Sequence, residues 1–574
     1  MQSEQELVDR AKAWIAADPD PVTQAELSAL IDARDWVELG ERMNGALSFG
    51  TAGLRGIVGA GPNRMNRAVV IRTTSGLASY LLQHVKDART LPVIVGYDGR
   101  LTSEEYARDT IRVLTRAGIP VRYFAMAAPT PLVAYAARQL GASAAVVVTA
   151  SHNPAEYNGY KVYAGNAIQI VPPVDEQIAD AIEKAPQPKN IPLSEFELNR
   201  PTESASLIPD SLIERYYDDI LPVRPACAKD QNISIVYTPM HGVGWRFAQQ
   251  AFHRSGYRNV TVVAEQAAPD GHFPTVKFPN PEEAGAMDLA FALAAKVKAD
   301  VVVANDPDAD RLAIALPKGG GYQQLTGNQV GLLLADFALQ YAPKLPQPLV
   351  AQSIVSSPML ESIATAYGAA YAQTLTGFKW IWNAALDLAR DHGVRFCFGY
   401  EEALGYSIGP LVRDKDGISV AVVFADLVAH CKASGTTVLE RLSDLYRRHG
   451  LWVSFQRSLV MPGTSGQAQI AAMMKKVTNT PPPVLGTRAV VSTTDYQSGE
   501  ENRPRWLHNT SLFELRLAGG GRVLVRPSGT EPKLKIYVDL RVEVAPDAAL
   551  TAREAEAEAE AKSIAEATEV FLRG

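Results

Sequence analysis

Apolar, strand-like segments that end abruptly in polar loops recur along this chain. The run Val146-Val147-Val148 predicts a buried strand, because it is short, apolar and β-branched, and Thr149-Ala150-Ser151-His152-Asn153-Pro154 follows it as a loop. Similar segments with polar loops begin near residues 93, 233, 300, 349 and 396. Ligands of open α/β sheets bind at the carboxyl ends of the strands. We therefore expect these loops to carry the chemistry.

The segments fall into three successive pairs, each separated by enough chain for crossover helices. This repetition predicts three related α/β domains instead of one long sheet. Helical spacing over residues 4–47 predicts a helical N-terminal extension, and the glycines of Gly50-Thr51-Ala52-Gly53-Leu54-Arg55-Gly56 predict a turn instead of an element. Such a turn can bring Arg55 against an anion.

A fourth region, predicted to be α+β, begins near residue 453. We predict two alternating strands, 522–525 and 535–540, and an Ala/Glu-rich helix that ends the chain. The acidic side chains of this helix are expected to face solvent. We expect these domains: 1–205 with the helical extension and the Ser151 loop, 206–322 with a metal-binding loop, 323–452 with a sugar-binding loop, and 453–574 with a phosphate-binding loop.

Composition narrows the functional class. The 574 residues are 47% hydrophobic and 21% charged, which is typical of a globular protein, and the net charge of −6 argues against nucleic-acid binding. No basic and apolar leader begins the sequence and no apolar run reaches a membrane-spanning length, so we expect a cytoplasmic protein without membrane partners. Cys227, Cys397 and Cys431 lie too far apart in the sequence to suggest a disulfide framework or a zinc site.

Two loops suggest phosphoryl chemistry. Ser151 is a candidate nucleophile, although a Ser-His pair in a loop is more often only a hydrogen-bonded turn. Asp306, Asp308 and Asp310 follow a Val-rich strand, and close carboxylates repel by about 4 kcal/mol per pair at an effective dielectric of 20. A divalent cation relieves this repulsion, and oxygen ligands suit Mg²⁺. A solvated acidic turn is the alternative interpretation.

Further loops suggest binding of a phosphorylated sugar. Arg526-Pro527-Ser528-Gly529-Thr530 offers a guanidinium, two hydroxyls and backbone amides to a phosphate, although a plain hairpin loop fits it too. Glu401-Glu402-Ala403-Leu404-Gly405 offers acceptors for sugar hydroxyls. Lys161, Lys379 and Lys415 lie beside turns, where a buried lysine can bind phosphate or transfer a proton and a surface lysine is the more frequent case. The chain lacks the G-x-x-x-x-G-K-[ST], G-x-G-x-x-G and G-x-S-x-G patterns.

Taken as an ordered set, these motifs resemble those of the α-D-phosphohexomutase family, the phosphoglucomutases and phosphomannomutases. The set spans residues 45–545 and comprises Gly50 to Gly56, Thr149 to Pro154, Asp306-Pro307-Asp308-Ala309-Asp310-Arg311, Glu401 to Gly405 and Arg526 to Pro532. Two further segments, Thr374-Leu375-Thr376-Gly377-Phe378-Lys379 and Thr238-Pro239-Met240-His241-Gly242, look most like the longer branch with phosphoglucomutases and phosphopentomutases. Ala403 departs from the serine that many relatives have, which affects sugar specificity more than the chemistry.

The resemblance implies a four-domain, heart-shaped protein with its active site in a central cleft. It implies that Ser151 carries a phosphoryl group, that one Mg²⁺ is held by this serine with Asp306, Asp308 and Asp310, and that Lys161 or Lys415 transfers protons. By the same resemblance His152 and Arg55 line the reaction centre. The implied substrate-binding residues are Thr376, Gly377, Lys379, Glu401, Ala403, Arg526, Ser528, Gly529 and Thr530.

The implied activity is interconversion of glucose 1-phosphate and glucose 6-phosphate through glucose 1,6-bisphosphate, which also serves as activator. Phosphomannomutase and phosphopentomutase activities are alternatives within the class, and a catalytically silent sugar-phosphate-binding regulator is an alternative outside it. We expect a small-molecule sugar phosphate as the partner, a monomer or weak homodimer, and movement of the region after residue 452 as a lid.

Overall fold

The computed structural model describes residues 4–51, 53–225, 231–341, 345–461, 464–528, 533–544 and 550–574. The chain separates into two compact units. The first takes in Met1–Arg224, Gln231–Gln324 and Gly405–Asp426, and the second takes in chiefly Leu325–Leu404 and Leu427–Gly574.

The first unit begins with three helices that have a small core of their own. They are α1 (Glu4–Ala17), α2 (Pro21–Asp32) and α3 (Trp36–Met43). Leu7, Leu27 and Leu39 are buried in this core, and Asp20 and Asp35 cap α2 and α3. The predicted helical extension is therefore confirmed.

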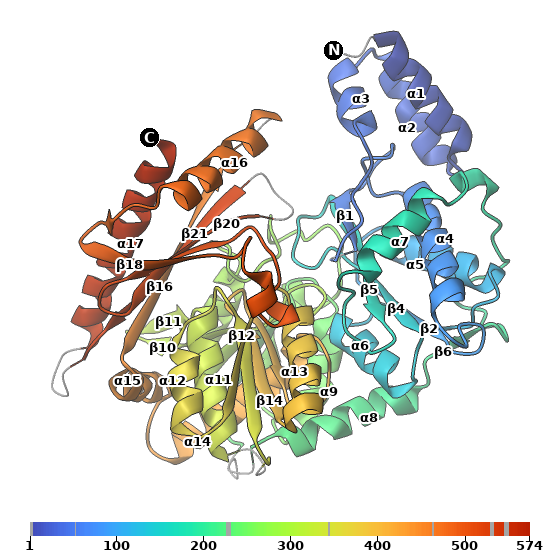
Figure 1. The fold of residues 1–574 in the computed structure, drawn as a ribbon. Coiled ribbons are helices and arrows are strands. Elements are labelled where there is room, and N and C mark those ends of the chain that lie inside the picture. The colour runs from blue at the N-terminus through green and yellow to red at the C-terminus, as the bar shows by residue number, and fades with distance from the viewer. Residues whose placement is uncertain are drawn as a thin grey trace. The chain divides into compact units, whose positions relative to one another are not determined.

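The first α/β domain is a six-stranded sheet with helices on both faces (Figure 1). Its strands, in the order β1-β5-β4-β2-β3-β6, are Leu54–Ile57, Tyr157–Ala164, Ala144–Val148, Val93–Tyr97, Val121–Tyr123 and Ala205–Leu207. Its helices are α4 (Arg67–His84), α5 (Ser103–Arg116), α6 (Thr130–Gln139) and α7 (Val174–Glu183), and α8 (Asp210–Ile220) follows. Val146 and Val148 of β4 pack toward α4 and α5, because they share a core cluster with Leu77 and Ile111.

The glycine pattern predicts a turn throughout residues 50–56, and this prediction is wrong for the second half. Leu54–Ile57 forms β1, which pairs antiparallel with β5 so that Arg55 lies opposite Gly159. Gly53 has a φ of 74°, and a Cβ there would lie 1.9 Å from the backbone oxygen of Tyr160. The glycine therefore permits close approach of two backbones, which then continue as strands.

The second α/β domain repeats the strand order of the first. Its sheet, β11-β10-β9-β7-β8, consists of Gly321–Gln324, Ala313–Lys318, Val301–Ala304, Ile235–Thr238 and Val260–Val262. Its helices are α9 (Gly244–Arg254) and α10 (Asp288–Val297). The two strands that carry polar loops, β7 and β9, are parallel neighbours, as β2 and β4 are in the first domain.

The second unit contains the third repeat. Its strands β12 (Pro348–Ser353), β13 (Ala370–Thr374) and β14 (Arg395–Glu401) are parallel, with β12 between the other two. The helices around them are α11 (Gly327–Tyr341), α12 (Met359–Ala366), α13 (Phe378–His392) and α15 (Val438–His449). Further along the chain, β15 (Gly405–Ile408) and the start of α14 (Gly417–Ala433) belong to the first unit.

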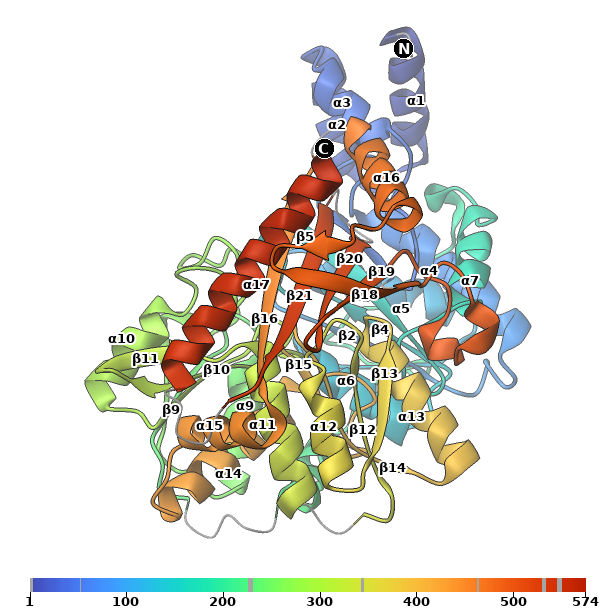
Figure 2. The ribbon, with the colours of Figure 1, turned by 60° about the vertical axis from the view of Figure 1, so that its left-hand side comes forward.

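The C-terminal domain is a six-stranded antiparallel sheet covered by two helices (Figure 2). In the order β16-β21-β20-β19-β18-β17 the strands are Leu451–Val460, Lys533–Val542, Gly521–Pro527, Phe513–Leu517, Arg488–Asp495 and Val484–Leu485. Helix α17 (Leu550–Arg573) packs along β16 and β21, and α16 (Thr464–Asn479) packs against β19 and β20. The predicted fold class, three α/β domains and a C-terminal α+β domain, is confirmed.

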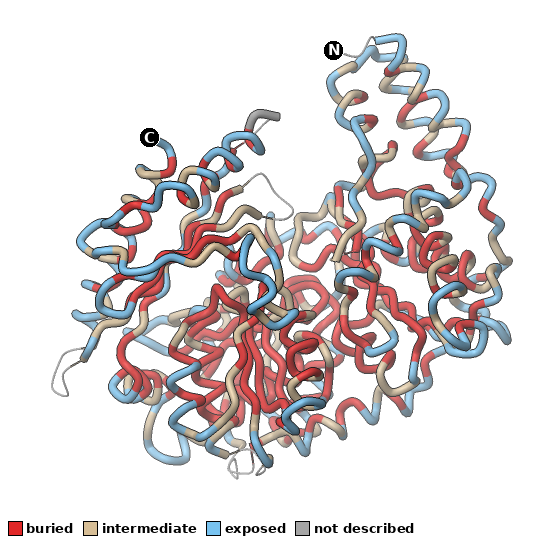
Figure 3. The backbone as a smooth tube through the Cα atoms, in the orientation of Figure 1, coloured by how far each residue is buried: buried red, intermediate tan, exposed pale blue. Residues whose placement is uncertain are grey.

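Two details of this domain differ from the sequence pattern. Strand β20 is buried from Gly521 to Val525 without alternation, because Leu524 packs against Ile354 and Val355 of the third domain. Figure 3 shows this buried centre of the sheet. The acids of α17 are also not all solvated, since Glu560 forms an ion pair with Arg488 at 2.8 Å.

Among the described residues, no single helix is long and apolar enough to cross a membrane; α14 and α15, a bent pair, meet that test together by length and composition only. Cys397 and Cys431 are buried free thiols, and Cys227 lies outside the described residues.

Candidate active site

The Ser151 loop follows β4 directly and holds its serine in an unusual backbone conformation. Ser151 has a φ of 51°, a left-handed value that non-glycine residues rarely adopt, and its side chain is buried. Its backbone amide donates to Oγ1 of Thr149 at 2.8 Å. Its hydroxyl donates to Oδ2 of Asp306 at 2.8 Å and lies 3.2 Å from Nδ1 of His152. The hydroxyl is therefore aimed at the acidic loop of the second domain.

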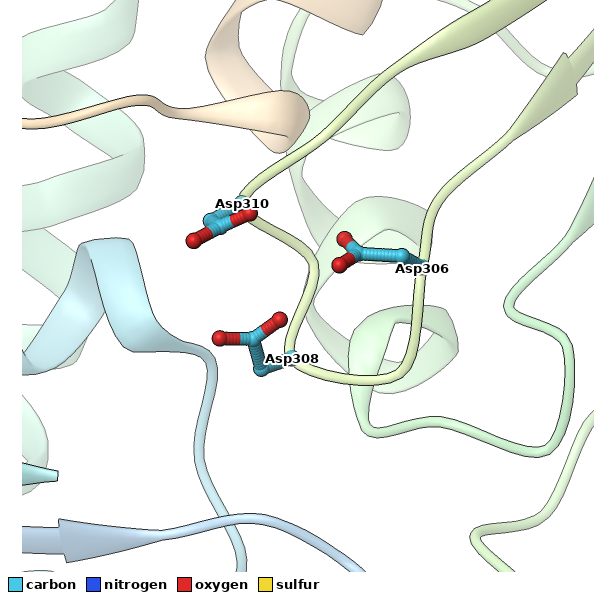
Figure 4. Close-up of side chains that lie close together, drawn as sticks. All are labelled: Asp306, Asp308 and Asp310. Carbon is cyan, nitrogen blue, oxygen red and sulfur yellow. The ribbon is translucent and has the colours of Figure 1, made fainter. Parts of the chain in front are cut away.

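Asp306, Asp308 and Asp310 converge at the carboxyl end of β9 (Figure 4). One oxygen from each lies within 4.8 Å of the other two, and all three residues are buried. Asp306 also accepts a hydrogen bond from the backbone amide of Arg311 at 3.0 Å, whereas Oδ1 of Asp308 and Oδ1 of Asp310 are buried without a hydrogen-bond partner. Two buried carboxylate oxygens without donors, next to a third carboxylate, are the arrangement that a divalent cation would complete.

Two lysines partly neutralise this cluster. Nζ of Lys161, on β5, lies 2.7 Å from Oδ2 of Asp308 and 3.0 Å from Oδ2 of Asp310. Nζ of Lys415 lies 3.4 Å from the same oxygen of Asp310 and 3.5 Å from Oδ1 of Asp414. Both lysines are thus within reach of the acidic cluster.

The pKa values in the cluster diverge for physical reasons. Burial and the neighbouring Asp308 and Asp310 raise the pKa of Asp306 well above its usual value. Burial alone would raise the pKa of Asp310 too, but Lys161 and Lys415 lower it below the usual range. Burial opposes the charge of Lys161, yet the carboxylates of Asp308 and Asp310 raise its pKa. The ammonium of Lys161 therefore lies between two ionised acids, Asp308 and Asp310, and Asp306 is the acid that ionises least readily.

The segment after β15 packs against the acidic loop and so brings Lys415 to it. The backbone amide of Gly417 donates to the oxygen of Ala309 at 3.2 Å, and a Cβ on Gly417 would lie 2.3 Å from the oxygen of Arg311. Only a glycine allows this approach.

Arg55 contacts the Ser151 loop, and His152 is the residue that follows the serine. Nη1 of Arg55 donates to Oδ1 of Asn153 in the Ser151 loop at 2.9 Å. Burial, together with the charges of Arg311 and Arg55, holds the pKa of His152 well below its usual value. The imidazole of His152 is therefore neutral and available as a hydrogen-bonding group.

The remaining predicted residues lie in the second unit. Glu401 ends β14 and accepts a hydrogen bond at 2.6 Å from the amide of Gly377. Gly377 has a φ of 115° and directly precedes α13. Glu402 accepts hydrogen bonds from the hydroxyls of Ser353 and Ser356 at 2.9 and 3.2 Å. The two acids thus have different hydrogen-bond partners within their own domain.

Arg526 lies near this pair of acids. Burial and the charge of Glu402 raise the pKa of Tyr537, and Arg526, which hydrogen-bonds Tyr537, opposes that rise. Ser528 donates its amide to the oxygen of Lys533 at 2.8 Å. Thr376 and Ala403 are half-buried in loops of the third domain, and Lys379 is half-buried in the first turn of α13. Gly529 and Thr530 lie outside the described residues.

Sequence reasoning missed two residues that hold the site together. Arg100 donates to backbone oxygens of the Ser151 loop, among them that of Ser151 at 2.8 Å. Thr130, at the start of α6, donates its hydroxyl to Oδ2 of Asp308 at 2.6 Å and its amide to the oxygen of Asp308 at 3.0 Å. The only sequence signal for either is its place in a polar loop after a strand or at a helix start.

Comparison with known families matches four consecutive descriptions along the chain. Residues 46–189 match "Phosphoglucomutase/phosphomannomutase, alpha/beta/alpha domain I", 214–320 match domain II, 326–449 match domain III, and 497–561 match the C-terminal domain.

Individual proteins resemble the chain over nearly its whole length. It is 37% identical to a probable phosphoribomutase of Schizosaccharomyces pombe over 94% of both chains. It is 40% identical to a probable phosphomannomutase of Haemophilus influenzae, over 83% of this chain and 93% of that one. Among solved structures, a phosphoglucomutase from Paramecium, parafusin, shares the fold with a TM-score of 0.65 at 19% identity, over 91% of this chain and 95% of that one. The chain therefore belongs to the α-D-phosphohexomutase family and is a phosphomutase.

Proposed function

We propose that this phosphomutase interconverts the 1-phosphate and the terminal phosphate of an aldose, with Ser151 as the phosphoryl carrier. The observation that carries this proposal is the 2.8 Å hydrogen bond from the buried Ser151 hydroxyl to Asp306, a member of the carboxylate cluster. A phosphoryl group on this oxygen would lie beside the three carboxylates, and a cation held by them would neutralise part of its charge.

Mg²⁺, one per chain, is the cation we propose for the cluster of Asp306, Asp308 and Asp310. Its oxygen-only donor set and the two partnerless carboxylate oxygens fit a hard divalent cation. When bound, the cation would neutralise negative charge on the oxygens of the transferring phosphoryl group.

The chain's own residues account for the proton movements. In the resting enzyme Asp306 accepts the hydrogen bond of the Ser151 hydroxyl and is positioned to take its proton when that oxygen is phosphorylated. We propose Lys161 or Lys415 as the proton-transfer group. As the sugar hydroxyl attacks phosphorus and the P–O bond to Ser151 breaks, the ammonium of this lysine protonates the leaving serine oxygen, and the lysine then takes up the proton of the sugar hydroxyl. Arg55 and neutral His152 orient the phosphoryl group, since such transfers depend mainly on position and electrostatics.

For the sugar and the phosphate that does not react, we propose the loops of the second unit. Thr376, Gly377, Lys379, Glu401 and Ala403 would contact the sugar or its phosphate. Arg526, Ser528, Gly529 and Thr530 would hold the distal phosphate. The nearness of Arg526 to Tyr537 and Glu402 supports a joint site for the two loops.

We propose a pentose phosphate as the preferred substrate, with ribose 1-phosphate and ribose 5-phosphate as the pair. The support is the name of a relative that matches 94% of the chain, and Ala403, which offers no hydroxyl to a sugar. Hexose phosphates, glucose or mannose 1-phosphate with the corresponding 6-phosphate, form the second candidate class, because the Haemophilus relative is named a probable phosphomannomutase. Glucose 1,6-bisphosphate is the phosphoryl donor that we propose for loading Ser151.

Comparison of kcat/KM on ribose, glucose and mannose 1-phosphates tests the substrate. Our proposal requires the highest value for the pentose, and a higher value for glucose would make the hexose pair the substrate. Ser151→Ala tests the carrier: we expect a folded protein without turnover on any of the three, and retained turnover would contradict the proposal. A regulator without activity would show no turnover even before substitution.

A further inference from the structure

The Ser151 loop needs support from outside its own backbone. Ser151 has a left-handed φ of 51°, which is unfavourable for an L-residue with a side chain by roughly 1 to 2 kcal/mol. The loop is neither helix nor strand. Among the described hydrogen bonds, backbone amides reach the oxygens of Ala150 and Pro154 but not those of Ser151 and Asn153, and buried carbonyls need donors.

One side chain supplies most of those donors. Nη2 of Arg100 donates to the oxygens of Ser151, at 2.8 Å, and Asn153. Nη1 donates to the oxygens of Pro154 and Tyr157, at 2.7 and 2.8 Å. A single planar guanidinium therefore fixes four carbonyls spread over the loop and the start of β5, which a lysine ammonium lacks the geometry to do.

Arg100 is itself held from two sides. Its Nε lies 3.4 Å from Oδ2 of Asp98, and that carboxylate also accepts the hydroxyl of Thr149 at 2.6 Å. Because Oγ1 of Thr149 in turn accepts the amide of Ser151, Asp98 reaches the serine through a second chain of hydrogen bonds. On the other side, the guanidinium carbon lies 5.2 Å from the ring centroid of Phe273 in the second domain, a cation–π contact.

From this geometry we infer that Arg100 is a positioning residue, which fixes the backbone of Ser151 so that its oxygen faces Asp306. The inference rests on the proposed role of Ser151 as phosphoryl carrier. The guanidinium contacts the loop's backbone and leaves the Ser151 hydroxyl to Asp306, so it acts on the rate of transfer through placement of the serine. Displacement of a reacting group by about 1 Å can lower a rate on the order of 100-fold.

The test compares Arg100→Lys with Arg67→Lys as a matched control. Arg67 is also an arginine of the first domain in a two-point ion pair, with Asp109 at 2.7 and 3.1 Å, but it has no contact with the loop among those described. The measured quantity is the rate at which labelled glucose 1,6-bisphosphate phosphorylates Ser151 in a single turnover. The dissociation constant of the sugar phosphate is measured alongside.

We expect Arg100→Lys to slow the transfer about 100-fold without a matching change in the dissociation constant, and Arg67→Lys to leave the transfer rate unchanged. We also expect guanidinium ion, below denaturing concentrations, to restore part of the rate of Arg100→Ala but to leave the wild type unaffected. If Arg100→Ala does not fold, Arg100→Lys alone decides.

A wild-type transfer rate in Arg100→Lys, an equal loss in both lysine variants, or an Arg100→Ala rate that guanidinium does not change would overturn the inference. Failure of the proposed function itself has a different signature, because wild-type protein would then carry no label on Ser151.

Discussion

Lys161→Met removes the positive charge that lies between two buried acids. The ammonium is 2.7 and 3.0 Å from carboxylate oxygens of Asp308 and Asp310, so each attraction is about 6 kcal/mol at an effective dielectric of 20. Desolvation of the three groups offsets much of that gain, and breaking a buried ion pair costs about 3 to 5 kcal/mol in practice. We expect the Met variant to lose this amount around the acidic loop when Mg²⁺ is absent.

Hydrogen exchange of β9 and the acidic loop measures this loss locally. A decrease of about 3 to 5 kcal/mol in opening free energy accelerates exchange roughly 100- to 5,000-fold. Mg²⁺ should slow exchange more in the variant than in the wild type, because the cation no longer competes with the ammonium for the same carboxylates. At a concentration 100 times its dissociation constant it adds about 2.7 kcal/mol.

Lys318→Met is the matched control, because Lys318 is exposed at the end of β10 in the same sheet. It should change exchange by no more than about twofold, as expected of a surface substitution. Exchange of Lys161→Met within about twofold of the wild type, or equal protection of both proteins by Mg²⁺, would refute the reasoning.

Three further substitutions test the other parts of the site. Asp310→Asn should raise the Mg²⁺ concentration for half-maximal activity at least about 100-fold, equivalent to about 2.7 kcal/mol; an unchanged metal titration would remove Asp310 from the metal site. Arg526→Ala should raise KM for the sugar phosphate about 100-fold, the loss expected of a charge-assisted phosphate contact; unaltered kinetics would place the distal phosphate elsewhere. Arg505→Ala should raise KM more than it lowers kcat, because Arg505 contacts Asp387 at 2.5 Å and Asn383 at 2.9 Å and so holds α13, the helix that carries the proposed substrate-binding Lys379. A loss in kcat alone would contradict substrate binding by this helix.

The positions of the reactive loops were predictable because they follow from strand order. The sequence places Ser151 and Asp306 each just after an apolar β-branched strand. Both loops then lie at carboxyl ends of parallel strands, where open sheets bind their ligands. The sequence does not predict the 2.8 Å contact between them, since residues 155 positions apart in two domains are joined only by packing.

Residues whose role depends on what surrounds them were not predictable. Arg100 stands in an ordinary Asp-Gly-Arg turn, and only the folded loop turns its guanidinium toward four carbonyls. The paired acids 401 and 402 look alike in sequence, yet one accepts a backbone amide and the other two serine hydroxyls. The apolar run Val523-Leu524-Val525 of β20 does not show which neighbour covers each face of the strand, and in the structure Leu524 packs against Ile354 and Val355 of the third domain.

Some predictions concern features that the described structure does not test. The domain boundaries, the oligomeric state and movement of the C-terminal domain as a lid remain predictions. Leu524 and Tyr537 of the C-terminal domain form a buried apolar contact with Ile354 and Val355 of the third domain. Movement of the C-terminal domain away from the third domain would have to break this contact.

Mass spectrometry of the protein after incubation with glucose 1,6-bisphosphate and Mg²⁺ tests the central claim most directly. We predict one phosphate per chain, on the peptide containing Ser151. We also predict that this phosphate is lost when excess substrate 1-phosphate is added without bisphosphate and the bisphosphate that the protein releases is removed. A chain that turns over substrate while Ser151 never carries phosphate would contradict the account.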